Sequence, residues 1–235
     1  MQNILTIYKK ELKSYFNSPI AYIVIIVFLT IVGWFFVNGF FGNNTTSMRP
    51  LFDFVPFVFL FFIPAITMRS FSEEKKQGTI ELLLTKPVND SELVIGKFLA
   101  ALVLTLFTLL PTVIYLLVAV NLGEMDWGSI IGGYIGLILM AGVYIGIGIF
   151  ASSLTENQVI SFIVSFIVVF ALFMMGKILT QISPGLVSAV EYVSTDYHFT
   201  NISRGVIDSR NIIYYFSMIF FTIFLTKVSI ESRKW

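Results

Sequence analysis

Six long apolar runs, separated by short polar stretches, follow one another along this chain. Each run is close to the length of about 20 residues that an α-helix needs to cross the hydrocarbon core of a bilayer. The pattern therefore predicts an all-α integral membrane protein, folded as a single transmembrane domain over residues 1–235. The expected spans are residues 20–41, 51–68, 98–120, 129–151, 159–176 and 211–226.

Residues 1–18 carry an amphipathic helical pattern instead. Leu5, Tyr8 and Leu12 recur at spacings of three and four, while lysines and Glu11 occupy the other face. Such a helix lies in the membrane surface with its lysines toward anionic headgroups, although a solvated leader to the first span also fits. Pro19 is expected to end this helix and turn the chain into the bilayer.

The segment 69–97 is a charged island between the second and third spans. Ser70 and Glu73 have the spacing of a capping box at a helix start. Asn89 and Glu92 repeat that spacing where the helix of the third span is expected to begin. Each end of the island would then be fixed by a capped turn.

Between these two boxes, Gly78 loosens the first turn and Thr79 restarts a short helix, which Pro87 ends. Its apolar residues fall on one side, so we expect it to lie across the inner surface of the membrane and to transmit pressure to both neighbouring spans. An ordinary solvated loop is the alternative.

The fourth span is rich in glycine at intervals of four residues. Such small-xxx-small steps let two helix backbones approach closely, and the partner is expected to be another span of this chain rather than a second subunit. The packing residues are Gly128, Gly132, Gly136, Gly142 and Gly146. The later segment 177–210 mixes apolar and polar residues, which predicts short helices half-sunk in the outer interface.

The distribution of lysine and arginine predicts the orientation, because these residues favour the cytoplasmic side. With the amino terminus inside, eleven of the 15 basic residues are cytoplasmic, as are both termini and the island. The four on the outer side are Arg49, Lys177, Arg204 and Arg210.

Composition supports the membrane assignment and removes several kinds of chemistry. Hydrophobic residues make up 57% of the chain and charged residues 12%, and the net charge of +1 gives no case for nucleic-acid binding. There is no cysteine, and His198 is the single histidine, so thiolate and paired-histidine metal sites are excluded. We expect His198 to be a structural hydrogen-bonding residue.

The expected spans contain one ionisable acid or base, Asp53, near the outer end of the second span. A proton-driven transporter needs a titratable relay inside its spans, so that class is disfavoured. No P-loop motif is present either. The chain is therefore expected to be no enzyme, to bind no cofactor itself and to receive its energy from outside the bilayer.

The string E-K-K-Q-G-T-I-E-L-L-L-T-K-P-V at 74–88, followed by S-E-L-V-I-G-K at 91–97, resembles the signature of ATP-binding-cassette (ABC) type-2 permeases. The six spans, the surface helix and the long outer segment fit that family along the whole chain. The stretch 197–208 is similar to the permease subunit of the gliding-motility-associated subfamily.

The resemblance implies a bacterial inner-membrane permease subunit of an exporter. Two copies of an ATPase subunit, which bind ATP and magnesium, would dock beneath two membrane chains: a second copy of this one, or a related subunit with a large outer domain. It also implies that residues 1–18 form a connecting helix. The coupling helix would consist of Glu73, Glu74, Gly78, Thr79, Glu81, Leu82, Leu83 and Pro87.

A second hypothesis belongs to a different class. ATP hydrolysis on the inner side would rearrange the outer segment 177–210, and the chain would act as a force-transmitting module that moves no solute. The apolar spans disfavour transport of small ions but fit both a lipid substrate and mechanical signalling. Solute or lipid movement in step with hydrolysis separates the two hypotheses.

Overall fold

The computed structural model describes residues 2–42, 47–79, 89–178, 190–206 and 208–232, which form helices and turns without a strand. Six helical stretches among them are long and apolar enough to cross a membrane. They are α2 (Pro19–Gly42), α3 (Arg49–Thr67), α6 (Asp90–Leu109) continued by η1 (Leu110–Thr112) and α7 (Val113–Val120), α8 (Trp127–Leu154), α9 (Gln158–Ile178) and α12 (Ser209–Glu231). Three shorter helices are α1 (Gln2–Asn17), α4 (Ser72–Lys76) and α11 (Thr195–Ser203).

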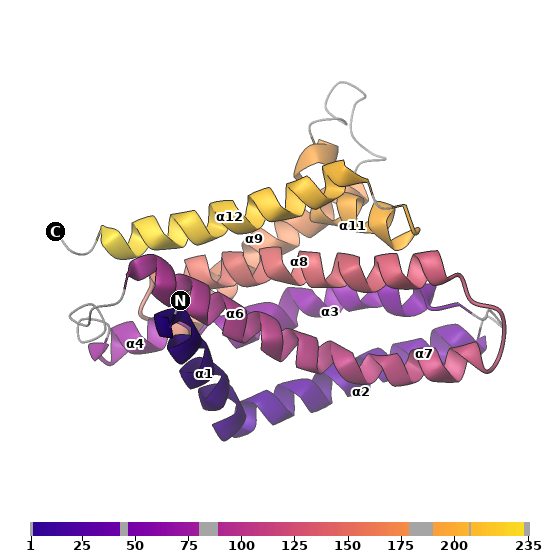
Figure 1. Ribbon diagram of the computed structural model, residues 1–235, viewed down its shortest axis with the longest axis horizontal. Coiled ribbons are helices and arrows are strands. Elements are labelled where there is room, and N and C mark those ends of the chain that lie inside the picture. Colours follow the sequence, from indigo (N-terminus) through magenta and orange to yellow (C-terminus); the bar gives the residue numbers. More distant parts are fainter. Residues whose placement is uncertain (1, 43–46, 80–88, 179–189, 207, 233–235) are drawn as a thin grey trace.

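The long helices run side by side along the long axis of the molecule (Figure 1). Helices α1 and α4 and the end of α12 lie at one end of the bundle, which we call the basal end. The connection between α7 and α8 lies at the opposite, distal end. Helix α1 crosses the direction of the long helices. Helix α2 begins at Pro19, and proline suits this position because the first N–H of a helix has no acceptor within the helix.

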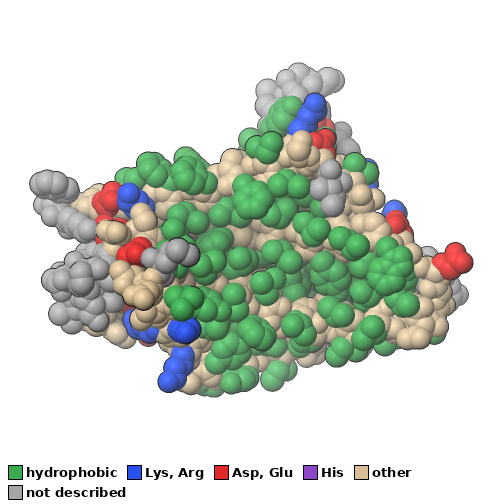
Figure 2. All heavy atoms as spheres, in the orientation of Figure 1, with side chains coloured by type: hydrophobic (Ala, Val, Ile, Leu, Met, Phe, Trp, Pro, Cys, Tyr) green, Lys and Arg blue, Asp and Glu red, His purple; other side chains and the backbone are tan. Residues whose placement is uncertain are grey.

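Helices α3 and α8 form the centre of the bundle. Within the most apolar part of each helix, 67% of the residues of α3 and 78% of those of α8 are buried. In the other four membrane-length stretches the buried share is a third or less. The remaining helices expose much of their apolar surface, as expected for helices that face lipid. Figure 2 shows one such face, where hydrophobic side chains cover the middle and charged side chains gather toward the two ends.

The third span differs from the expected single helix over 98–120. It breaks after Leu109, because Pro111 has no N–H for the helical ladder, and a 3₁₀ turn joins the two parts. Its helix begins at Asp90, as the Asn89–Glu92 capping box predicts, so Lys97 lies inside the helix although it precedes the expected span.

Helix α11 belongs to the segment 177–210, in which short helices at the outer interface are expected. It packs against α8, α9 and α12, and Thr195, His198 and Phe199 are buried there. His198 Nδ1 lies 2.7 Å from Asn211 Oδ1, and its ring stacks on Tyr214 with centroids 4.0 Å apart. His198 is thus a buried, hydrogen-bonded residue, as predicted.

Candidate functional site: a buried charge cluster at the basal end

The candidate site lies where α1, the turn before α4 and the first turns of α6 meet. Lys97 is its central residue, with a side chain that is only 2% exposed. Its ammonium nitrogen lies 3.1 Å from Glu11 Oε1 of α1 and 2.9 Å from Glu74 Oε1 of α4. It also donates to the carbonyl oxygen of Ser70 at 2.7 Å. One lysine thus connects three segments that are far apart in the chain.

The environment of Lys97 accounts for its burial. An ammonium group has three donors, and Glu11, Glu74 and the Ser70 carbonyl supply three acceptors. The group also lies 5.0 Å from the centre of the Phe71 ring, within the range of a cation–π contact. A buried charge is tolerated when it is paired and hydrogen-bonded in this way.

Local sequence places Lys97 at this position. Glu92 Oε2 accepts a hydrogen bond from the Asn89 backbone N–H at 3.2 Å, which confirms the capping box predicted at the start of α6. The same oxygen accepts from Asn3 Nδ2 of α1 at 3.0 Å. At Gly96 a Cβ atom would lie 2.7 Å from Ile7 Cγ2, so only glycine lets α1 pack this closely before Lys97.

The first backbone amides of α4 are capped by a side chain of α8 and not by a residue next to them in the sequence. The backbone N–H groups of Phe71 and Ser72 donate to Ser152 Oγ at 2.8 and 3.0 Å, and Ser152 donates to the Met68 carbonyl at 3.2 Å. Lys75, which is buried, donates to the carbonyl of Ser153. The α4 helix is therefore joined to the last turn of α8.

The predicted Ser70–Glu73 capping box is wrong. Helix α4 begins two residues after Ser70, with Phe71 at the N-cap and no side-chain cap. Glu73 Oε2 instead pairs with Arg69 Nε at 3.1 Å. Ser152 Oγ accepts from two other backbone amides at this start, those of Phe71 and Ser72.

The residues expected to couple to an ATPase are placed in part. Glu74 belongs to the charge cluster, whereas Glu73 is about one-third exposed. Gly78 has φ +65°, a backbone conformation that favours glycine, and Thr79 Oγ1 donates to the Glu74 carbonyl at 3.2 Å. Glu81, Leu82, Leu83 and Pro87 lie outside the described residues.

The glycines of α8 contact helices of this same chain. A Cβ at Gly132 would collide with the Ile202 carbonyl oxygen, and one at Gly136 would lie 2.9 Å from the Phe199 ring. These two positions therefore face the short helix α11, not another span. Gly142 and Gly146 face Ile219 and Thr222 of α12 in the same way, whereas Gly128 has more space.

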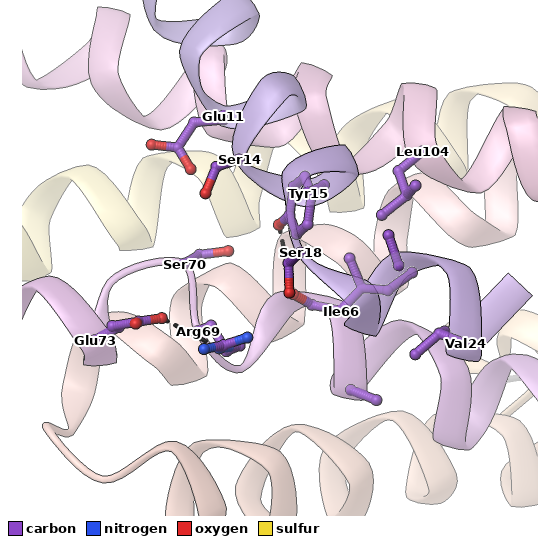
Figure 3. A pocket seen from close by; sticks show the side chains of 12 residues that line it. Glu11, Ser14, Tyr15, Ser18, Val24, Ile66, Arg69, Ser70, Glu73 and Leu104 are labelled. Atoms are coloured by element: carbon purple, nitrogen blue, oxygen red, sulfur yellow. Dashed lines mark hydrogen bonds and ion pairs between the residues drawn. The ribbon is translucent and has the colours of Figure 1, made fainter.

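A small cavity of about 160 Å³ lies beside the charge cluster, between α1, the start of α2 and the end of α3 (Figure 3). Tyr15 lies on its wall and donates its hydroxyl to the Ile66 carbonyl at 3.4 Å. Burial raises the pKa of the Tyr15 phenol, and the nearby Glu11 carboxylate raises it further, so the hydroxyl stays protonated. The polar residues that line the cavity are Glu11, Ser14, Tyr15, Ser18, Arg69, Ser70 and Glu73.

These groups hydrogen-bond and pair, and they form no constellation for bond-breaking chemistry. Within the described parts of the chain, no group of three or more His, Cys, Asp or Glu residues is placed to hold a metal ion. The basal charge cluster consists of a lysine neutralised by two carboxylates. Its arrangement fits mechanical connection between helices.

Comparison with known proteins decides the family. Residues 5–217 match the profile of the family described as "ABC-2 family transporter protein". The chain belongs to the ABC-2 transporter family. Members of this family are the membrane-spanning, typically non-catalytic permease subunits of ABC transporters, and the family implies an ABC ATPase as partner.

Individual relatives agree with this assignment. The chain is 28% identical over 152 residues to the "Probable multidrug ABC transporter permease YbhR" of Escherichia coli strain K12, and equally to that of strain O157:H7. The alignment covers 60% of this chain and 38% of either relative.

Sequence reasoning missed Lys97, Ser152 and Arg69 as parts of the candidate site of this ABC-2 family chain. Lys97 carried a signal, because it is a lone cation next to a glycine within the apolar pattern of the helix that Asn89 begins. Ser152 carried none, since a serine near a helix end is common and its partners lie about 80 residues away.

Proposed function

We propose that this chain is the permease subunit of an ATP-driven exporter in the bacterial inner membrane, with the basal end and both termini in the cytoplasm. The excess of lysine and arginine at that end supports the orientation. ATP and magnesium would be bound by the ATPase partner, two copies of which would act on a pair of membrane subunits. The second subunit is either another copy of this chain or a relative with a large outer domain.

The observation that carries the proposal is the contact of Lys97 with both Glu11 and Glu74. An ATPase that moves the segment 69–87 would displace α4, and through Lys97 it would displace α1 and α6 together. In this proposal α1 is the connecting helix. The coupling helix contains Glu73, Glu74, Gly78 and Thr79, together with Glu81, Leu82, Leu83 and Pro87.

Co-purification tests the coupling role. Gly78→Pro places a ring at φ +65°, which proline cannot adopt, and Glu73→Lys reverses a partly exposed charge. We expect both variants to insert into the membrane normally and to retain less ATPase than the unaltered chain. Glu231→Lys is the matched control, because it reverses an exposed charge at the same end outside the segment. Unchanged ATPase binding and hydrolysis in both variants would remove the coupling role.

Orientation has a separate test, because the chain has no native cysteine. A single cysteine at Thr79 should react with a membrane-impermeant thiol reagent from the cytoplasmic side only. One at Ser203, near the distal end, should react from the outside only. The reverse pattern would refute the proposed topology.

A second candidate, force transmission without transport, is favoured by the contacts of α8. At its basal end Ser152 and Ser153 hold α4, and at its distal end Ser129 Oγ donates to the Ser203 carbonyl of α11 at 2.7 Å. One continuous helix thus connects the proposed coupling segment to the outer segment. We propose a role in gliding motility on the sequence likeness of residues 197–208 to that subfamily.

Purified complex in vesicles distinguishes the two functions. Movement of a solute or lipid in step with ATP hydrolysis supports the exporter, whereas hydrolysis that alters labelling at Ser203 without any such movement supports force transmission. Deletion of the gene in a gliding host should abolish gliding, and normal gliding would exclude the motility role.

A further inference from the structure

Two hollows on the α2–α3 side of the molecule adjoin each other. One is the basal cavity described above, and the other is an apolar groove of about 440 Å³ between α2 and α3. Val24 and Ala65 line both of them. The polar cavity at the basal end and the apolar groove along α2 and α3 are therefore neighbours, with Val24 and Ala65 at their boundary.

The groove has the composition of an acyl-chain site. Its walls are made almost entirely of aliphatic and aromatic side chains, and Val27, Phe57 and Phe61 on its rim are about half exposed. A helix surface of this kind faces hydrocarbon in a membrane, so the groove is filled by lipid chains and not by water. The lining residues are Ile23, Val24, Val27, Phe28, Ile31, Phe54, Phe57, Val58, Phe61, Phe62 and Ala65.

The basal cavity has the chemistry of a headgroup site that carries both signs of charge. Arg69 supplies a guanidinium, which suits a phosphate, and Glu11 and Glu73 supply carboxylates, which suit an ammonium group. Figure 3 shows these side chains around the cavity, with the Arg69–Glu73 ion pair on one side and Glu11 above.

Ser70 gives an independent indication that a polar ligand belongs here. Its side chain is 6% exposed and lines the cavity beside the Tyr15 hydroxyl, but Ser70 Oγ makes no hydrogen bond of ordinary geometry to Tyr15 or to any other described residue. A buried hydroxyl without a partner is costly, so such groups usually meet a ligand or an ordered water. A phosphate oxygen in the cavity would satisfy it.

We propose that this surface binds one phospholipid with a phosphoethanolamine headgroup. The phosphate lies at Arg69 and Ser70, the primary ammonium lies toward Glu73 and Glu11, and an acyl chain enters the groove past Val24 and Ala65. The amine is favoured over a choline because its N–H groups donate to the carboxylates. A purely anionic headgroup is disfavoured, because the charges in and beside the cavity balance: Arg69, Lys10 and Lys97 are paired with Glu11, Glu73 and Glu74. The site does not depend on which partner drives the chain.

Photolabelling of the full chain in nanodiscs tests the site. The probe is a phosphatidylethanolamine with a diazirine on the first methylenes of one acyl chain. We expect crosslinks in the peptides around Val24, Val27, Phe61 and Ala65, and unlabelled phosphatidylethanolamine should compete at least about tenfold better than phosphatidylcholine or phosphatidylglycerol. Soluble phosphoethanolamine should not compete, because it lacks the chains that fill the groove.

Two pairs of variants separate this site from the general lipid surface. Arg69→Gln should reduce labelling about tenfold, whereas Arg210→Gln, at an exposed arginine near the distal end, should not. Ala65→Phe should block the passage between cavity and groove, whereas Val168→Phe enlarges an exposed residue of α9 and should have no effect. Thermal unfolding confirms that each variant is folded.

Three results would overturn the proposal. They are crosslinks spread equally over the exposed faces of α9 and α12, equal competition by all three lipids, and competition by phosphatidylglycerol stronger than that by phosphatidylethanolamine. Because labelling needs no ATPase, loss of ATPase binding with intact labelling would contradict the proposed function alone. Absent labelling with intact ATPase binding would contradict this site alone.

Discussion

Lys97 Nζ lies 2.9 Å from Glu74 Oε1, so the first turns of α6 and the helix α4 meet through one buried ion pair. Glu11 of α1 completes the cluster at 3.1 Å. Lys10 lies 3.9 and 4.0 Å from the same two carboxylates, yet its side chain is 62% exposed. The two lysines therefore share their partners and differ in burial, which makes them a matched pair for mutation.

Lys97→Ala should destabilise the basal end strongly. It leaves the Glu11 and Glu74 carboxylates, which are 16% and 15% exposed, without their buried cation. Removal of one partner from a buried ion pair costs about 3–5 kcal/mol. Thermal unfolding of the purified chain and proteolysis at α1 measure the loss.

Lys10→Ala is the control, because an exposed ion pair contributes about 0–1 kcal/mol. Equal, small effects of the two substitutions would show that the cluster is not a structural junction. Lys97→Met with Glu11→Gln and Glu74→Gln should recover part of the stability, since no uncompensated charge remains.

Ser152→Ala should loosen α4 from α8. The hydroxyl accepts from the N–H groups of Phe71 and Ser72, and loss of a capping acceptor costs about 0.5–2 kcal/mol. Hydrogen exchange at these two amides should rise, while exchange in the middle of α3 stays unchanged. Ser217→Ala on the exposed side of α12 is the control, because this hydroxyl bonds within its own helix. Protected amides in the Ser152 variant would contradict the role assigned to its hydroxyl.

The spans could be predicted from the sequence because their signal is local. Twenty or so apolar residues in a row identify a membrane helix without any knowledge of its neighbours. The Asn89–Glu92 capping box was predictable for the same reason, since both partners lie within one turn. The 3₁₀ break at Pro111 could not be predicted in this way, because proline is tolerated in membrane helices and its presence alone does not fix its effect.

The charge cluster could not be predicted, because its contacts join distant residues. Glu11 lies 86 positions before Lys97, and the amides of α4 are capped by a serine about 80 positions later. The Ser70–Glu73 box was wrong because α4 begins at Ser72, where the distant Ser152 accepts from the Phe71 and Ser72 amides, and Glu73 pairs with Arg69. The four-residue period of glycines predicted close packing but did not identify α11 as the partner of Gly132.

Asp196 should give the distal end a dependence on pH. Burial raises the pKa of its carboxyl, while Lys177 Nζ at 3.0 Å opposes the shift. Because the folded chain holds this proton to higher pH than the unfolded chain, stability should fall as pH rises from 3.8 through the raised value. Thermal unfolding between about pH 4 and 7 measures this slope.

Asp196→Asn should remove that part of the slope, because the amide does not titrate. Asp208→Asn is the control, since this residue is exposed and asparagine also caps a helix. An unchanged slope in the Asp196 variant would show that another group is responsible.

Gly132→Ala should destabilise the contact between α8 and α11. A Cβ at this position would collide with the backbone carbonyl of Ile202, which can move only if α11 shifts, and overpacking of this kind costs about 1–3 kcal/mol. Gly128→Ala is the matched control in the same glycine series, because its Cβ would stay 3.3 Å from the nearest atom. Alanine gains about 1 kcal/mol of helix propensity in the interior, at position 132, and less in the first turn, at position 128, so a lower melting temperature for Gly132→Ala alone reports the collision. Because both helices belong to one chain, that decrease should not depend on protein concentration, and a concentration-dependent effect would place the contact between subunits.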